Sequence, residues 1–376
     1  MIERTRFERE IENLRSETFS EAESFAWLPS IAPKGLSKRH FILVAGFDYE
    51  DPDENQFTAY CKNRIERILQ KKPGSKKDPG LIFTLFDVGA GVVKSNEVIN
   101  KKRIWVNKSN FTPVTAANNY SGIRFDKNPA GIMSITDVYD FVRAQSRSDP
   151  GSIQELNFFS HGFLEGPILV NSKDKQRRNP TRDPDDKDGR ARKDFSPPNM
   201  NAAALKEFAD AFSKDGFIWV WGCVFTGSSF QVLHRVLKSR KYHSKVKDDE
   251  MFELEFEPHH EALFFSDDPD FFPAMRADGT YARKFWRSFK EIKDFLQKMF
   301  DATYCKSIAK ASQRKCFGAL PGTYSLDEKT KNLPMMLVPQ RKPPYKDEFS
   351  WQVSFYAKHL NISLDKEGRG YGVYLP

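Results

Sequence analysis

Four short, almost purely apolar runs constrain the fold of this chain more than any other feature. They are Phe41–Gly46, Leu81–Phe86, Leu156–Ser160 and Phe217–Trp221. Apolar and polar residues do not alternate within them, and this pattern is typical of strands that are buried on both faces, as in a parallel sheet covered by helices. The runs therefore predict a sheet that lies between two layers of helix.

The segments between these runs carry apolar residues at helical spacing. They predict helices over residues 57–69, 135–147, 201–212 and 230–239, with Ser134 as the cap of the second and Ser228 or Ser229 as the cap of the last. Residues 88–133 are polar and show no clear pattern. Alternating strands and helices predict an open, doubly wound, mostly parallel α/β sheet.

The pattern divides the chain into three parts. Residues 1–37 predict an N-terminal helical extension, residues 38–245 the α/β domain with a polar insertion at 172–198, and residues 246–376 a C-terminal α+β extension. Whether the last part belongs to the same domain is left open. Within it the spacing predicts one long helix over 284–313 and strands at Met335–Val338, Trp351–Phe355 and Tyr371–Tyr374.

Charge and hydropathy exclude several classes of protein. The 59 Lys and Arg residues exceed the 51 Asp and Glu residues by a net +8, but the two signs are interleaved, so no basic stripe indicates nucleic-acid binding. The longest apolar run, Phe217–Phe225, is too short to span a bilayer. The N-terminal sequence lacks the apolar stretch of a signal peptide, which predicts a cytoplasmic protein and leaves delivery as an effector or toxin open.

Cysteine usage indicates free thiols. The chain has four cysteines, and no two of them have the C-x-x-C spacing of a zinc ribbon or a thioredoxin-type site. Without a signal peptide, they favour a reducing compartment over a disulfide framework.

Chemically active residues follow the predicted strands. In an open α/β sheet, functional groups gather beyond the carboxyl ends of the strands, and these ends are followed here by Asp48, Asp87, His161 and Cys223. Because His161 and Cys223 follow consecutive buried strands with one crossover helix between them, we expect them to lie side by side.

The chemistry of this pair is that of a nucleophile and a base. A thiol is mostly protonated at neutral pH, and a neighbouring imidazole can accept its proton. Gly162 follows the histidine and Gly222 precedes the cysteine, so the backbone can approach a substrate closely there. The backbone amides of Gly162 and Cys223 are the predicted oxyanion hole.

These motifs resemble those of a known superfamily. The strand that ends in Ser160-His161-Gly162 and the strand that ends in Trp221-Gly222-Cys223 are similar to the His-Gly and Cys motifs of caspase-like cysteine peptidases. That superfamily includes caspases, metacaspases, clostripain, gingipains, separase and the cysteine protease domains of bacterial toxins. The resemblance covers residues 38–245, and the Gly-Cys dipeptide is most similar to the toxin domains, not to the Gln-Ala-Cys-x-Gly of animal caspases.

The resemblance implies a caspase-like fold and a function. It implies that His161 accepts a proton, that Cys223 is the nucleophile of a cysteine endopeptidase acting on a protein or peptide, and that the Gly162 amide helps to form the oxyanion hole. Asp48, Asp87 and Glu165 are candidate acids for a pocket that selects Lys or Arg before the cleaved bond. The polar insertion, with Arg177 and Arg178, is predicted to gate the site or to be cut in self-processing.

Two other functions remain open from the sequence. One is a catalytically inactive caspase-like interaction module. The other is an α/β-hydrolase-type esterase or lipase, but that fold needs a nucleophile elbow with Gly two residues before and two residues after the nucleophile. Cys223 has neither glycine, which leaves only a divergent serine site at Ser228 for this alternative.

No cofactor or metal is predicted to be required. Gly89-Ala90-Gly91 lacks the third glycine of a dinucleotide fingerprint, and His259-His260 lacks the i, i+4 spacing of a helical zinc site. The acidic run at 183–189 departs from a calcium loop, so calcium stays open only because some metacaspases use it. The surplus of Lys and Arg also permits an anionic activator, such as the inositol phosphate of the toxin domains.

Overall fold

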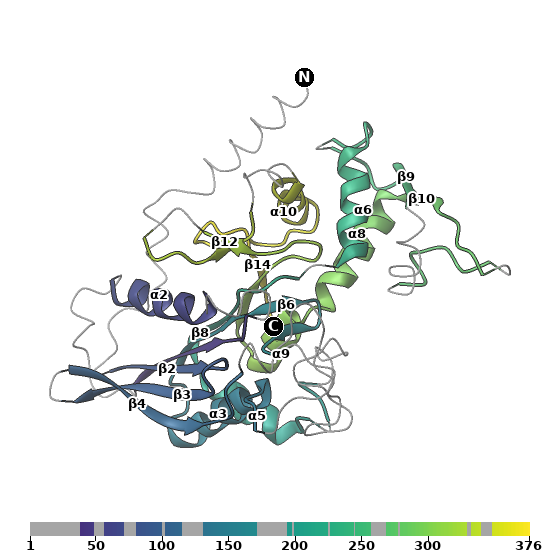
Figure 1. The fold of residues 1–376 in the computed structure, drawn as a ribbon. Helices are drawn as coiled ribbons and strands as arrows, with labels where there is room; N and C mark the ends of the chain where they lie inside the picture. Colours follow the sequence, from purple (N-terminus) through teal and green to yellow (C-terminus); the bar gives the residue numbers. More distant parts are fainter. Residues whose placement is uncertain are drawn as a thin grey trace.

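A computed structural model gives the fold of this chain (Figure 1). The predicted N-terminal helix over residues 1–37 lies outside the described residues, and so does residue 198 together with positions 172–193 of the polar insertion. The described residues are 38–48, 56–70, 80–99, 102–114, 131–170, 194–197, 199–224, 226–243, 245–256, 268–276, 279–328, 332–339 and 348–376.

An eight-stranded, mostly parallel sheet forms the centre of the protein, in the order β14-β11-β8-β5-β1-β2-β3-β4. Its strands are β1 (Arg39–Ala45), β2 (Leu81–Asp87), β3 (Val92–Ile99), β4 (Lys102–Asn110), β5 (Ile153–Phe159), β8 (Phe212–Val220), β11 (Lys315–Gly318) and β14 (Gly372–Tyr374). The pairs between β2, β1, β5, β8 and β11 are all parallel, whereas β14, β3 and β4 join antiparallel. The predicted α/β class with a mostly parallel sheet is confirmed.

The strand order reverses beside β1. From β1 the chain passes to β2 on one side, and it later returns to build β5, β8 and β11 on the other side. Such a reversal is the point at which the loops after two neighbouring strands diverge and leave room for a site. The carboxyl ends of β1 and β5 meet at this point, and β8 ends next to β5.

Helices cover both faces of the sheet, as Figure 1 shows. The described helices are α2 (Gln56–Gln70), α3 (Ile135–Ser148), α5 (Ala202–Asp210), α6 (Gly227–Lys238), α8 (Phe289–Asp301), α9 (Tyr304–Ser312) and α10 (Glu348–His359). On β5, Glu155 and Phe159 contact α2, whereas Phe158 packs against Tyr304 of α9 on the opposite face. Both faces of β5 are thus buried, which is why its sequence does not alternate.

Two predicted elements of the C-terminal part are wrong. The long helix predicted over 284–313 is in fact three elements: strand β10 (Lys284–Ser288), which pairs with β9 (Met251–Glu255), and then helices α8 and α9. The hydroxyl of Ser288 accepts the N–H of Glu291 and begins α8, and the hydroxyl of Thr303 accepts the N–H of Lys306 and begins α9. Each cap begins a separate helix, although the apolar residues keep helical spacing through the whole segment.

The strand predicted at Trp351–Phe355 lies inside helix α10. Phe349, Val353 and Tyr356 are buried at helical spacing, and their aromatic and β-branched side chains mimic strand composition. Helix α6 begins at Gly227 with Thr226 as its cap, and not at Ser228 or Ser229. The polar stretch without a predicted structure contains β3 and β4.

The remaining strands are short. β6 (His161–Phe163) pairs with β7 (Gly166–Ile168), and β12 (Leu326–Asp327) pairs with β13 (Met336–Leu337). No described helix is both long and apolar enough to cross a bilayer.

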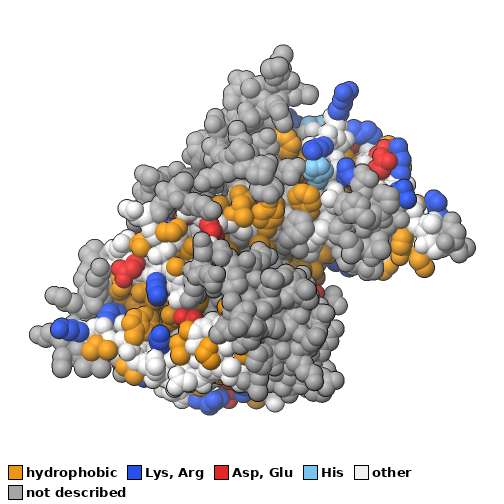
Figure 2. Space-filling model, in the orientation of Figure 1, with side chains coloured by type: hydrophobic (Ala, Val, Ile, Leu, Met, Phe, Trp, Pro, Cys, Tyr) orange, Lys and Arg blue, Asp and Glu red, His pale blue; other side chains and the backbone are white. Residues whose placement is uncertain are grey.

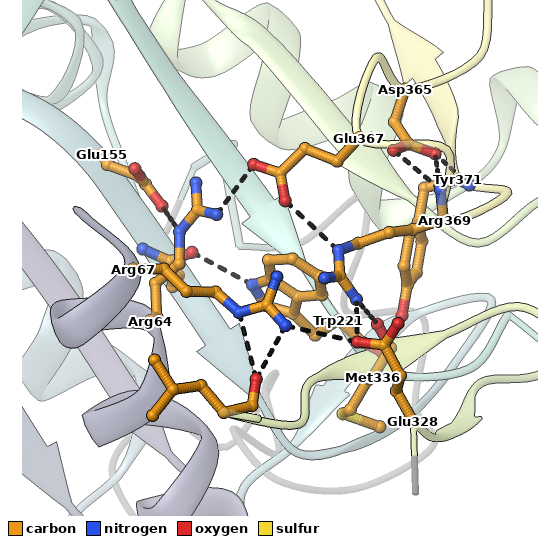
Figure 3. Close-up of polar contacts among 12 residues, drawn as sticks. Arg64, Arg67, Glu155, Trp221, Glu328, Met336, Asp365, Glu367, Arg369 and Tyr371 are labelled. Atoms are coloured by element: carbon orange, nitrogen blue, oxygen red, sulfur yellow. Dashed lines mark hydrogen bonds and ion pairs between the residues drawn. The ribbon is translucent and has the colours of Figure 1, made fainter. Parts of the chain in front are cut away.

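An alternating chain of arginines and glutamates, most of them buried, ties α2 to the C-terminal segment (Figure 3). In this ionic chain, Arg64 lies 2.6 Å from Glu155 and 2.9 Å from Glu367. It continues through Arg369 to Glu328, which also contacts Arg67. Burial alone would lower the pKa of Arg64, but the two glutamates raise it above its ordinary range. The guanidinium of Arg64 also lies over the Trp219 and Trp221 rings, so this ionic chain packs against the end of β8.

We expect Glu155→Gln to lower the free energy of unfolding by about 3 kcal/mol or more, because the variant leaves the buried Arg64 without its closest counter-charge. Denaturant unfolding measures this difference. Glu253→Gln is the matched control, because its ion pair with Lys284 is exposed and its loss leaves the stability nearly unchanged. Equal effects of the two substitutions contradict the role of the ionic chain.

His40 is a buried, neutral histidine at the start of β1. Its Nδ1 lies 3.1 Å from Oε1 of Gln145, and its Nε2 lies 2.7 Å from the hydroxyl of Thr84. Burial lowers the pKa of His40 to about 4, although the bond to Gln145 raises it. The folded pKa is thus below the unfolded value, so the stability that His40 contributes is present above the unfolded pKa and is lost as the pH falls through the folded pKa.

We expect the wild type to lose about 3 kcal/mol of stability through His40 as the pH falls from 7 to 4, since each pKa unit corresponds to about 1.4 kcal/mol. The difference in unfolding free energy between the wild type and His40→Gln measures this contribution, because pH effects of other groups cancel. His243→Gln, which removes an exposed imidazole, is the control. A pH-independent difference for His40→Gln contradicts the prediction.

Candidate active site

Parallel pairing brings the ends of three strands to one edge of the sheet. Ala45 of β1 pairs with Phe159 of β5, and Phe158 pairs with Val220 of β8. The residues that follow these pairs are Asp48, His161 and Cys223. The three side chains therefore start from neighbouring strand ends at the point where the strand order reverses.

Two glycines allow the histidine and cysteine segments to pack backbone against backbone. A methyl group at Gly222 would lie 2.6 Å from the carbonyl oxygen of Ser160 and 3.2 Å from the nitrogen of Gly162. A methyl group at Gly162 would lie 3.0 Å from the carbonyl oxygen of Cys223. A side chain at Gly222 would clash with the backbone of the histidine segment, and one at Gly162 would need a small shift, so the two glycines allow the backbones of the two segments to touch.

Asp48 holds the ring of His161. Its Oδ1 lies 2.9 Å from Nε2 of the imidazole, and the ring of Phe57 meets the imidazole edge-on at 5.2 Å between centroids. The carboxylate is buried and the imidazole is half-buried, so the contact is partly shielded from water. The contact of Asp48 with Nε2 fixes the orientation of the imidazole ring.

Cys223 differs from the other cysteines in exposure. All four cysteines are described, and Cys61, Cys305 and Cys316 are buried whereas Cys223 is half-buried. A segment that follows β11 lies against it: the N–H of Ser325 donates to the sulfur at 3.4 Å, and Val224 forms a bridge with Thr323. Residues that follow β11 thus contact both Cys223 and the residue after it.

The other predicted site residues have different surroundings. Asp87 is buried, and its Oδ1 accepts the N–H of Ala90 at 3.0 Å in the turn between β2 and β3. Glu165 is half-buried in the turn between β6 and β7, four residues after His161. Asp48 contacts the histidine. The three predicted acids thus lie at the ends of three different strands. Asp48 contacts His161 and Asp87 accepts a hydrogen bond in a turn, so both have partners within the protein.

The described residues form no cluster of metal ligands, and the face in Figure 2 shows no single charged patch. No three His, Cys, Asp or Glu side chains of the described residues gather as a metal site. The acidic run at 183–189, the Arg177-Arg178 pair and His259-His260 lie outside the described residues. On the face in Figure 2, the described Lys and Arg side chains are spread over both ends of the molecule among apolar and acidic ones.

The sequence left open whether the C-terminal part joins the same domain, and it did not predict that this part contributes residues to the site. Ser325 lies 102 residues beyond Cys223, in a stretch whose only local signal is the Pro321-Gly322 turn. It reaches the site because β11 adds to the sheet beside β8, and β14 adds beside β11. Asp48 was predicted as an acid that binds substrate, and its contact with His161 depends on pairing of β1 with β5.

Comparison with known proteins adds no relative: no family model, no curated protein and no solved structure matches this chain.

Proposed function

We propose that this protein is a cysteine endopeptidase of the caspase-like type, with His161 and Cys223 as its catalytic pair. The observation that carries the proposal is the backbone contact between the His-Gly and Gly-Cys segments, at the edge of the sheet where the strand order reverses. The half-buried thiol and the carboxylate on the imidazole add to it. The order of the two motifs along the chain is that of the superfamily the sequence resembles.

The reaction follows from these positions. His161 takes the proton of the Cys223 thiol, and the thiolate attacks the carbonyl carbon of the scissile peptide bond, so that a carbon–sulfur bond forms. The amides of Gly162 and Cys223 bind the oxyanion of the tetrahedral intermediate. His161 then protonates the leaving amine as the carbon–nitrogen bond breaks. Water, deprotonated by His161, releases the acyl group and restores the thiol.

Asp48 acts as a positioning residue in this proposal. Its contact with Nε2 fixes the orientation of the ring for the proton transfers. A carboxylate beside the imidazole also stabilises the imidazolium that forms when the thiol loses its proton. The two remaining predicted acids, Asp87 and Glu165, stay candidates for binding a basic residue of the substrate.

A peptide probe with an electrophilic carbon tests the nucleophile. We expect the probe to label the wild type and not Cys223→Ala, and we expect His161→Ala to slow labelling and cleavage by about 10²- to 10⁴-fold. Cys61→Ala is the control for loss of a cysteine and keeps full labelling, because that thiol is buried. Equal labelling of wild type and Cys223→Ala, or none of either, contradicts the proposal and favours an inactive interaction module.

A panel of peptides that vary before the cleaved bond tests specificity and the role of Asp48 together. We expect cleavage after Arg or Lys. If Asp48 positions His161, then Asp48→Asn lowers kcat for all cleaved peptides alike, by at least about tenfold. If Asp48 instead binds the basic side chain, the loss is confined to Arg and Lys peptides and appears mainly in KM, which contradicts the positioning role.

A further inference from the structure

A chain of hydrogen bonds links the end of the C-terminal segment to the sulfur of Cys223. The hydroxyl of Tyr371 lies 2.9 Å from the carbonyl oxygen of Trp221 and 3.0 Å from Oγ of Ser325, and it donates between these two acceptors. Oγ of Ser325 in turn donates to the carbonyl oxygen of Gly222 at 3.2 Å. The two hydroxyls thus bind the two residues that directly precede Cys223.

The backbone of the same residue, Ser325, also contacts the sulfur of Cys223. Its N–H donates to Sγ of Cys223 at 3.4 Å, and its carbonyl oxygen accepts from the thiol over a longer distance, 3.9 Å. A donor that is closer than the acceptor favours the thiolate over the thiol, because hydrogen bonds to the charged form of a group stabilise that form. The position of this one N–H therefore influences how easily Cys223 ionises.

Tyr371 is well placed to hold that N–H in position. Its ring is fully buried and meets the rings of Trp219 and Trp221 edge-on. Burial raises the pKa of Tyr371 above its ordinary range, so its hydroxyl is protonated and can donate at neutral pH. Figure 3 shows Tyr371 beside Arg369, which lies over the Trp221 ring in the ionic chain.

We propose that Tyr371 and Ser325 are positioning residues for Cys223, and that the C-terminal segment thereby sets the reactivity of the thiol. The inference rests on the proposed use of Cys223 as a nucleophile, and it deepens that proposal by assigning a role to residues 322–325 and 371. Removal of the Tyr371 hydroxyl frees Ser325 to move, which weakens the N–H to sulfur bond and disfavours the thiolate.

Other ionisable groups lie near this network. His161, held by Asp48, lies on the segment that packs against Gly222 and Cys223. Tyr371 interacts electrostatically with Arg369, Cys223 and Asp365, and Asp365 accepts the backbone N–H groups of Arg369 and Tyr371. Burial raises the pKa of Asp365 to about 6, against the effect of these N–H donors. A comparison of variants with the wild type over the same pH range cancels these common contributions.

The rate of alkylation by iodoacetamide as a function of pH tests the inference in the full-length protein. We expect Tyr371→Phe to raise the apparent pKa of the Cys223 thiol by about one unit, which slows alkylation about tenfold below that pKa. Ser325→Ala removes the hydroxyl that links the two groups and is expected to shift the profile in the same direction. Cys223→Ala supplies the background from the other thiols.

Tyr374→Phe is the matched control. Tyr374 is also fully buried and donates its hydroxyl to one carbonyl oxygen, that of Ala319, at the end of β11. We expect its alkylation profile to coincide with that of the wild type. A Tyr371→Phe profile that coincides with the wild type in a folded protein overturns the inference, and so does an equal shift in Tyr374→Phe.

The readout separates this inference from the proposed function, because alkylation needs no substrate. A shifted profile in a protein that cleaves no peptide supports the positioning role and contradicts the peptidase. Peptide cleavage through Cys223 with an unshifted profile supports the peptidase and overturns the positioning role.

Discussion

The candidate site depends on the close packing of two backbone segments at the carboxyl edge of the sheet. Parallel pairing of β5 with β8 brings the segments together, and the absence of side chains at Gly162 and Gly222 lets them touch. The backbone that carries His161 thereby lies against the backbone that carries Cys223. The catalytic proposal rests on this packing, whereas the contact of Asp48 with His161 depends on the pairing of β1 with β5.

The opposite side of the cysteine is built from the C-terminal part of the chain. Strands β11 and β14 extend the sheet, and the segment after β11 reaches back to Cys223. The ionic chain joins α2 to Glu328, Glu367 and Arg369, and the guanidinium groups of Arg64 and Arg369 lie over the Trp221 ring. Its charges alternate in sign, so each buried arginine has a counter-charge, which a low-dielectric interior requires. The same C-terminal part of the chain thus supplies both this ionic chain and the hydrogen bonds at Cys223.

Local sequence patterns predicted the helices and strands whose apolar residues repeat with a regular spacing. They failed where a capping hydroxyl or tertiary packing determined the secondary structure. The helices α2, α3 and α5 follow from apolar spacing alone. The division of residues 284–313 into β10, α8 and α9 depends on the hydroxyls of Ser288 and Thr303, which the apolar period conceals. Helix α10 is rich in aromatic and β-branched residues, which are common in strands. Here the packing of one helical face against the protein determines their conformation instead.

The sequence by itself determined the buried parallel strands and the identity of the residues at their ends, because both are written in short local patterns. Only the tertiary structure decided which groups face His161 and Cys223. The contact of Asp48 with the imidazole spans 113 residues and depends on strand pairing. The donor to the sulfur is a backbone N–H, which every residue except proline possesses, so no side chain marks it in the sequence.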